Sequence, residues 1–289
     1  MQLDIPMTDF PEFLQFHVNT YVEVFVDWIN AVLGGPIHSI SSLVLWLMIY
    51  VEKFLLWLPW WLIIIVVFLA GWRRLSFYSG LAFALMLVCV GAFGYWELMI
   101  YTLAIVLASV VISLIVGIPI GILMAYSPFA QTVVKPILDF MQTMPSMVYL
   151  IPAMIFFGMG KVPAVFATTV YAIPPVIRLT DLGIRQVSNE MVEAATSFGS
   201  SSWDILTKVQ LPQALPAIMT GINQTTMMAL SMVVIASMVG AKGLGMEVLI
   251  SMNRIDVGRG FEAGLGIVIM AVIIDRLSQG LAQRYKIPD

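Results

Sequence analysis

The chain contains runs of about 20 apolar residues that are almost free of charge, and these runs constrain its fold more than any other feature. A helix that crosses the hydrocarbon core of a bilayer needs roughly 20 such residues, because each residue adds about 1.5 Å of rise. Only 11% of the residues are charged, whereas a soluble domain carries roughly 25%. The sequence therefore predicts an all-α polytopic membrane protein. It excludes a soluble enzyme, a disordered chain and a nucleic-acid-binding protein.

We expect seven membrane-spanning helices. They are Phe54–Trp72, Leu75–Tyr95, Leu98–Tyr126, Thr132–Met159, Val162–Thr180, Gln213–Gly240 and Phe261–Gln283. The apolar segment Ser41–Val51 is only 11 residues long, and it could pair with Phe54–Trp72 as a tight helical hairpin. That alternative gives eight spans and moves the N-terminus to the other side of the membrane.

The N-terminal region, residues 1–53, is expected to precede a transmembrane domain of residues 54–289. Within it, Tyr21–Leu33 has the pattern of an amphipathic helix, with polar residues recurring on one face and apolar residues on the other. Such a helix either lies in the membrane interface or packs against the spans. The first 52 residues contain no Lys or Arg, so a cleavable signal peptide is not expected.

Basic residues set the expected orientation, because they accumulate in cytoplasmic loops. We place the segment between the fifth and sixth spans in the cytoplasm, which leaves more basic residues inside than outside. The inner ones are Arg73, Arg74, Lys135, Arg178, Arg185, Lys208, Arg276, Arg284 and Lys286. The outer ones are Lys53, Lys161, Lys242, Arg254 and Arg259. With seven spans, the C-terminus is then cytoplasmic and the N-terminus lies outside.

The longest polar stretch, Arg178–Leu211, lies in this cytoplasmic segment and is typical of two short helices joined by a glycine. Ser188 or Asn189 can cap the first helix. Gly199 follows it as a residue that adopts positive φ without a steric penalty. Ser201 can cap the second helix, with an acidic residue three positions later as in a capping box.

The same stretch resembles the EAA motif of bacterial ABC importer permeases. The residues that carry the resemblance are Glu193, Ala194, Ala195, Gly199, Val209, Leu211 and Pro212. In that family the motif forms the coupling-helix region, which docks into a groove on a separate ATP-hydrolysing subunit. The resemblance therefore implies that residues 181–212 couple this chain to an ATPase. Small alanines that allow close approach, a glycine turn and an exposed charge suit that role, and an ordinary helix–turn–helix is the alternative. Pro212 either ends the second helix or begins the next span.

A further resemblance, to permeases for glycine betaine, proline betaine and related quaternary amines, covers the chain from about Glu97 to its end. It rests on residues 141–149, 172–178, 221–224, 230–236 and 240–245. The implied fold is the bundle of a type I ABC importer permease. The first 70 residues match this subfamily only in general character.

The resemblance implies the permease subunit of a binding-protein-dependent importer in the bacterial cytoplasmic membrane. Two permease chains, commonly copies of one chain, form the pore, two ATPase subunits bind below, and a binding protein delivers cargo from outside. The chain has no G-x-x-x-x-G-K-[ST] P-loop. ATP and Mg are therefore expected on the ATPase subunits, and this chain is expected to bind no cofactor or metal and to have no enzymatic activity.

Other functions stay open at this point. Choline, carnitine, trimethylamine N-oxide, proline or a sulfonium osmolyte are alternative cargoes for the same importer class. An ion-coupled secondary transporter is a more remote alternative. It would need ionisable residues in the middle of its spans, and the centres of the seven predicted spans have none.

Several residues are candidates for the translocation path. They are Gln142, Met144, Pro145, Tyr149, Tyr171, Asn223, Gln224 and Met232. Tyrosine faces bind quaternary ammonium groups, and methionine side chains can repack between two states of a gate. The amide side chains could line a path for a zwitterion. The alternatives are ordinary core or lipid-facing positions and hydrogen bonds between helices.

Overall fold

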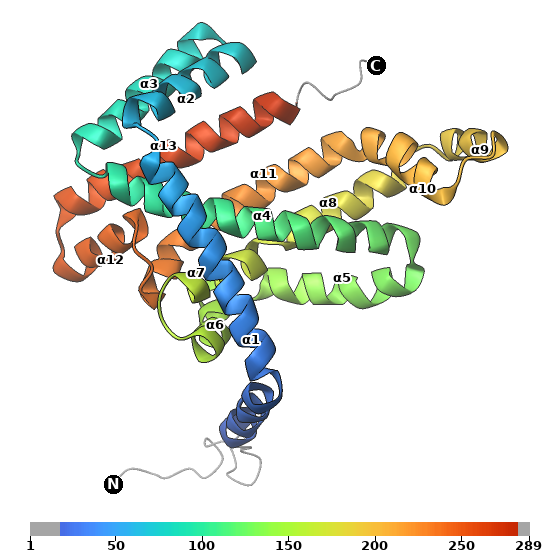
Figure 1. Cartoon of the computed structure of the whole chain (residues 1–289), viewed down its shortest axis with the longest axis horizontal. Coiled ribbons are helices and arrows are strands. Elements are labelled where there is room, and N and C mark those ends of the chain that lie inside the picture. The colour runs from blue at the N-terminus through green and yellow to red at the C-terminus, as the bar shows by residue number, and fades with distance from the viewer. Residues whose placement is uncertain (1–17, 283–289) are drawn as a thin grey trace, which may run out of the picture. The chain divides into compact units, whose positions relative to one another are not determined.

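The computed structural model describes residues 18–282, and within that range the chain is helical and has no strand (Figure 1). It divides into two compact units, one up to residue 42 and one from residue 43 onward. Helix α1 (Val18–Trp57) begins in the first unit and ends in the second, and all later elements belong to the second. The predicted domain boundary after residue 53 stays a prediction.

Helix α1 runs without interruption through segments that we expected to be separate. The predicted amphipathic helix Tyr21–Leu33 and the segment Ser41–Val51 are both parts of it. The alternative in which Ser41–Val51 forms a tight hairpin with the next span is therefore wrong. The helix ends just before Leu58 and Pro59, because proline offers no N–H and disfavours the α conformation of the residue before it.

Helices α2 (Trp60–Arg74) and α3 (Phe77–Ala92) form a hairpin of short helices. Their 15 and 16 residues rise about 22–24 Å, which is less than the roughly 30 Å of a hydrocarbon core. The predicted spans Phe54–Trp72 and Leu75–Tyr95 are therefore wrong in their bounds. Pro59 delays the start of α2, and the Ser76 side chain caps α3 by accepting a backbone N–H.

The predicted span Thr132–Met159 is not one straight helix, because it is broken in the middle. Helix α5 (Pro128–Thr143) is followed by the 3-10 turn η2 (Ser146–Tyr149) and by α6 (Leu150–Phe157), and the chain bends by 113° between them. Met144 takes an extended backbone with ψ 132°. A residue that precedes a proline favours this conformation, so Pro145 places the break.

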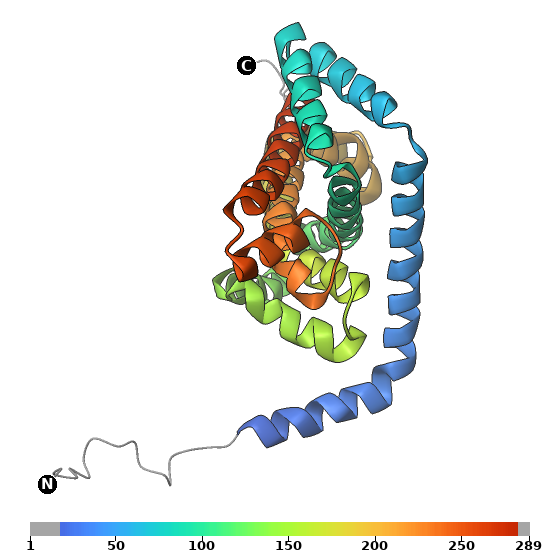
Figure 2. The same ribbon diagram turned by 90° about the vertical axis from the view of Figure 1, so that its left-hand side faces the viewer.

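The centre of the second unit consists of longer helices (Figures 1 and 2). They are α4 (Trp96–Tyr126), α7 (Lys161–Ala172) with α8 (Pro174–Arg185), α11 (Leu211–Ala236) and α13 (Val257–Ala282). The short helix α12 (Leu244–Arg254) follows the 3-10 turn η4 (Ser237–Val239) and leads into α13. Within residues 18–282, five helical stretches are long and apolar enough to cross a membrane, or six if α5 and α6 count as one bent span. Helix α1 is one of the five, whereas α2 and α3 are too short to be counted, so the spans differ from the predicted seven in identity as well as in number.

Helices α4 and α8 are held unusually close together. A Cβ atom on Gly117 would lie 2.5 Å from Val176 Cγ1, and one on Gly121 would lie 2.6 Å from the Cβ atom of Thr180. Only glycine fits at such distances, as expected for a pair of small residues four positions apart in a membrane helix. The two helices therefore run as a tightly packed pair toward the polar segment that follows α8.

Candidate functional site

The polar segment between α8 and α11 lies at one end of the second unit, beyond the apolar helices (Figure 1). It consists of α9 (Asn189–Ser197), α10 (Ser202–Asp204) and the π-helical turn η3 (Ile205–Gln210). No residue of α9 is buried. Because tertiary packing contributes little here, caps and turns set most of the shape of this part.

Gly199 forms the turn that ends α9. Its φ is +79°, its N–H donates to the Thr196 carbonyl at 2.9 Å, and the next N–H donates to the Ala195 carbonyl at 3.1 Å. These two bonds form a Schellman motif, in which a left-handed residue satisfies the last carbonyls of a helix. At the other end, the Ser188 side chain caps α9, and Asn189 is its first residue. The predicted glycine turn and the Ser188 cap are confirmed.

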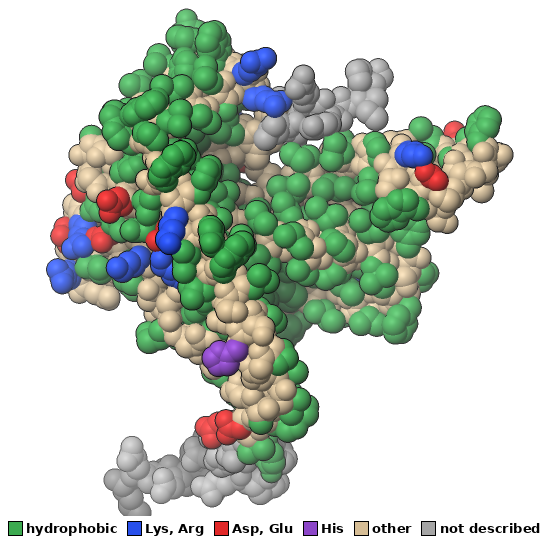
Figure 3. All heavy atoms as spheres, in the orientation of Figure 1, with side chains coloured by type: hydrophobic (Ala, Val, Ile, Leu, Met, Phe, Trp, Pro, Cys, Tyr) green, Lys and Arg blue, Asp and Glu red, His purple; other side chains and the backbone are tan. Residues whose placement is uncertain are grey.

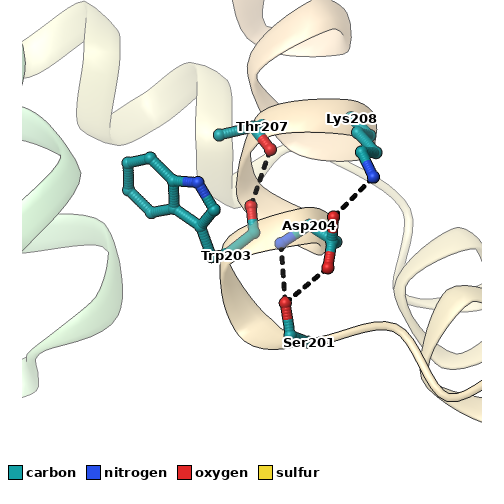
Figure 4. A network of polar contacts seen from close by, with 5 residues as sticks. All are labelled: Ser201, Trp203, Asp204, Thr207 and Lys208. Atoms are coloured by element: carbon teal, nitrogen blue, oxygen red, sulfur yellow. Dashed lines mark hydrogen bonds and ion pairs between the residues drawn. The ribbon is translucent and has the colours of Figure 1, made fainter.

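Ser201 opens the next helix. Its hydroxyl accepts the Asp204 N–H at 3.2 Å and donates to the Asp204 carboxylate at 2.6 Å. The Lys208 ammonium lies 2.5 Å from the other carboxylate oxygen, and Thr207 donates to the Trp203 carbonyl beside them (Figure 4). The bonds from Lys208 and from Ser201 lower the pKa of this polar-segment carboxyl, Asp204. The predicted pairing of Ser201 with an acid three residues later is confirmed.

The turn η3 joins this polar segment to α11 without a gap. Its hydrogen bonds span five residues instead of four, as in the bond from the Leu211 N–H to the Leu206 carbonyl. Pro212 follows directly, and it cannot donate to the Lys208 carbonyl four residues back because it has no N–H. Pro212 lies in the first turn of α11, so it begins the next span and does not end a separate helix.

Apolar packing fixes the base of the segment. Ile205 and Leu206 are the buried residues of η3. Leu206 packs in one cluster with Ile184 of α8 and with Ala214 and Ile218 of α11. Leu206 therefore connects η3 to both α8 and α11.

Polar contacts reinforce the same base. The Tyr126 hydroxyl at the end of α4 donates to the Gln210 side chain. The Gln213 amide lies 2.9 Å from the Met191 sulfur, which connects α11 to α9. The Arg185 guanidinium at the end of α8 bonds to a backbone carbonyl of α4. The polar segment is thus tied to α4, α8 and α11 at its base and is free of packing at its tip.

Large apolar side chains are exposed at this tip. Phe198, directly before the glycine turn, is 90% exposed, and Trp203, shortly after it, is 71% exposed. Met191 on α9 is also exposed, and Figure 3 shows hydrophobic surface beside charged groups at this end of the molecule. Sequence reasoning missed both aromatic residues. The available signal was an aromatic residue on either side of a glycine turn within a polar segment.

The structure brings the residues of the predicted motif into this one projection. Glu193, Ala194 and Ala195 lie on α9, Gly199 forms the turn, Val209 lies in η3, and Leu211 and Pro212 begin α11. Glu193 is exposed, whereas Val209 and Leu211 are half-buried at the base. The motif therefore combines an exposed face on α9 with a packed connection to the long helices.

Two of the predicted path residues lie in the main apolar core. Tyr149 and Met232 are buried there, and Met144 and Tyr171 pack against the same cluster. The rings of Tyr149 and Tyr171 meet edge to face with centroids 5.7 Å apart. The Tyr149 hydroxyl donates to the Met141 carbonyl. Within this single chain, Tyr149 therefore has the contacts of a core residue.

The other path candidates lie apart from that core. Gln142 and Pro145 are exposed at the bend between α5 and α6, and Gln224 is exposed on α11. Asn223 donates to the Asp275 carboxylate of α13 at 3.0 Å, so it makes the contact between helices that was the alternative to lining a path. Sequence reasoning missed Asp275, although this acid lies inside the predicted span Phe261–Gln283, eight residues before its end.

Among the residues described, 18–282, no group of three or more His, Cys, Asp or Glu side chains is placed to hold a metal ion. The polar segment projects from the end of the membrane helices α8 and α11. It has an exposed apolar tip, a glycine turn closed by two backbone hydrogen bonds and a packed base.

Comparison with known proteins gives consistent relatives. Residues 117–287 match the family described as the binding-protein-dependent transport system inner membrane component. The glycine betaine/carnitine transport permease protein GbuB of Listeria monocytogenes is 47% identical over 270 residues, which are 92% of each chain. The glycine betaine/proline betaine transport system permease protein ProW of Escherichia coli is 42% identical, over 92% of this chain and 75% of its own.

A solved structure shows the same fold. It is an inward-facing conformation of the MetNI methionine ABC transporter, matched with a TM-score of 0.59 at 22% identity over 65% of this chain and 94% of that one. This likeness supports the bundle architecture predicted for a type I importer permease.

Proposed function

Because this chain belongs to the family of binding-protein-dependent transport system inner membrane components, we propose that it is the permease subunit of an ATP-driven importer for glycine betaine or a related quaternary amine. The structural observation that carries this proposal is the docking geometry of the segment around Gly199. The cargo class is supported by relatives whose names specify glycine betaine.

The polar segment is the proposed contact with the ATPase. Phe198 and Trp203 expose apolar surface at the tip, and neither α9 nor α10 contains a buried residue. Exposed aromatic residues of this size are typical of anchors at protein interfaces. Glu193 lies on the same projection and offers a charge to the partner. We propose that residues 181–212 act as the coupling segment.

The base of the segment supplies the mechanical connection. Leu206 packs against both α8 and α11, and α8 is packed against α4 at the distance set by Gly117 and Gly121. When ATP binding draws two ATPase subunits together, a displacement of the tip shifts these three helices as a group. Such a rigid-body movement about an interface is a common form of switching between states.

The remaining assignments follow from this role. A second permease chain, two ATPase subunits that hold ATP and Mg, and an extracytoplasmic binding protein complete the proposed importer. The chain lies in the bacterial cytoplasmic membrane, with the coupling segment and the C-terminus on the cytoplasmic side. It carries no catalytic step itself. The exposed residues Gln142, Pro145 and Gln224 are the proposed contributors to the translocation path, which forms where two permease chains meet.

The test is uptake into proteoliposomes that contain this chain, its ATPase and its binding protein. The labelled compounds are glycine betaine, choline, carnitine and proline. Each is tested with and without ATP in the compartment that faces the ATPase. We expect glycine betaine uptake that requires ATP. If the ATPase is active but only another compound is taken up, the cargo assignment changes to that compound. Uptake that is independent of ATP but follows an ion gradient would refute the importer mechanism.

A further inference from the structure

A cavity lies away from the polar segment, between the α2–α3 hairpin and the start of α4. Its volume is 510 Å³, and its walls are mostly apolar. The lining includes Trp60, Ile64, Leu87, Gly91, Trp96 and Glu97. Neither the coupling segment nor the path candidates contribute to it, so the proposed function leaves this cavity unexplained.

The hairpin itself explains why the cavity exists. Gly71 and Gly80 hold α2 and α3 in close contact near their turn, where a Cβ atom on Gly80 would lie 2.5 Å from the Phe68 carbonyl oxygen. At the other end of the hairpin, bulky residues such as Trp60 and Leu87 face the gap and no such glycine contact exists between α2 and α3. The two helices are therefore clamped at one end and spread at the other, where α4 begins.

The position of the cavity in the membrane follows from α4. The last residue of α4, Tyr126, contacts the base of the polar segment through Gln210. The helix has 31 residues and rises about 46 Å, so its first residues Trp96 and Glu97 lie at the opposite membrane face. This placement rests on the cytoplasmic assignment proposed above for the polar segment. The cavity then opens at the level of the outer headgroups, where tryptophan is enriched.

The chemistry of the lining indicates an amphiphile with a positively charged head. Ile64 and Leu87 offer a surface for hydrocarbon. Trp60 and Trp96 offer indole faces that attract a cation and N–H groups that can donate to oxygen. Glu97 is an exposed carboxylate among the lining residues. A free zwitterionic osmolyte would leave most of an apolar cavity of this size unfilled.

We infer that this cavity binds a phospholipid of the outer leaflet whose headgroup carries a primary ammonium, as in phosphatidylethanolamine. The acyl chain lies along Ile64 and Leu87, and the ammonium lies beside Glu97 and the indole rings. Glu97 also stands in the first turn of α4, where a carboxylate stabilises a helix. The experiment therefore separates lipid binding from helix stability.

The measurement is lipid retention on the assembled transporter, taken from bilayers of phosphatidylethanolamine and phosphatidylglycerol with identical acyl chains and analysed by native mass spectrometry. Glu97→Gln keeps the side-chain shape and removes the charge. Gly91→Leu fills the cavity, because a Cβ atom there meets only a Trp96 ring carbon at 3.8 Å. The matched controls are Glu262→Gln and Gly264→Leu, outside the cavity, and thermal stability is recorded for all four variants.

We expect retained phosphatidylethanolamine to fall about fivefold in Glu97→Gln, as for the loss of one charged contact. In Gly91→Leu both lipids should be lost, and both controls should retain lipid like the unmodified protein. Unchanged phosphatidylethanolamine in Glu97→Gln or in Gly91→Leu at normal stability would overturn the assignment. Displacement of the lipid by millimolar glycine betaine would overturn it too, because the site would then serve the soluble amine. Lipid retention is measured without transport, whereas the importer proposal is tested by uptake. Failure of one proposal is therefore distinguishable from failure of the other.

Discussion

Replacing Gly199 tests the coupling segment most directly, because this residue holds the turn through its backbone alone. A Cβ atom at Gly199 would meet nothing within 4 Å. A larger side chain therefore causes no clash, and the whole penalty comes from φ +79°. An L-residue in this region costs about 1–2 kcal/mol, and a β-branched residue costs more.

That penalty is comparable to what holds the turn. The Schellman motif contributes two backbone hydrogen bonds, each with a net value of about 0.5–1.5 kcal/mol, and α9 buries no residue that could add to them. Since 1.4 kcal/mol corresponds to a factor of ten, we expect Gly199→Ala to weaken binding of the ATPase about 5- to 30-fold. Gly199→Val should abolish transport, and Gly199→Asn should retain most of it because asparagine tolerates the left-handed region.

Two quantities are measured in proteoliposomes: the dissociation constant between this chain and the ATPase, and ATP-driven uptake. Gly94 supplies the matched control. It has φ +81°, and a Cβ atom there would meet nothing within 4 Å. It lies between α3 and α4, at the far end of α4 from the polar segment. Gly94→Val therefore introduces the same backbone strain at another site. Normal uptake by Gly199→Val, or equal loss in the Gly94 and Gly199 variants, would refute the reasoning.

Three further changes test separate parts of the structure. Glu193→Ala should reduce co-purification of the ATPase several-fold, whereas Glu190→Ala on the same helix should not; equal effects would remove Glu193 from the docking contact. Phe198→Ser should weaken ATPase binding roughly tenfold or more, as for an aromatic interface anchor, while leaving thermal stability unchanged because the ring is exposed; a lowered melting temperature would contradict this. Gly121→Leu should lower the melting temperature, because the larger side chain forces α4 away from Thr180. Overpacking of this kind costs about 1–3 kcal/mol. A stability equal to that of the unmodified chain would show that the close approach is dispensable.

The sequence was sufficient for features that depend on local chemistry. The Ser188 and Ser201 caps and the Gly199 turn all follow from what single residue types can do at given spacings. The same holds for the all-α class, because a continuous apolar run of about 20 residues has the length of a spanning helix, which satisfies its backbone groups within itself. These predictions needed no knowledge of which helices are neighbours.

The errors arose where apolar runs were divided into spans. Hydropathy is continuous through Pro59 and Pro145, so composition does not reveal that a proline ends one helix and turns the chain. The error in α1 is the opposite one. Gly34, Gly35 and Pro36 usually interrupt a helix, but α1 continues through them. Whether a proline breaks a helix depends on neighbouring contacts, which a single sequence does not contain.

Burial of the site residues could not be predicted either. Phe198 and Tyr149 are both aromatic residues near glycine or proline, yet one is 90% exposed and the other 4%. The difference comes from long-range packing, since Tyr149 meets Tyr171 of another helix and Phe198 has only its own short segment beside it. Asn223 likewise depends on Asp275, 52 positions away.

The π turn η3 affects the relative orientation of α10 and α11, the two helices that it joins without a loop. A π turn amounts to one extra residue in an α-helix, and one residue corresponds to about 100° of rotation. The face that α10 turns outward and the face that α11 turns into the bundle are therefore set independently, although no loop separates them. Deleting a single residue from 205–210 would rewind this stretch into a plain α-helix and swing the tip around the axis of α11 without removing any of its side chains. The number of residues in η3 thus contributes to the direction in which the tip points, together with the contacts at its base.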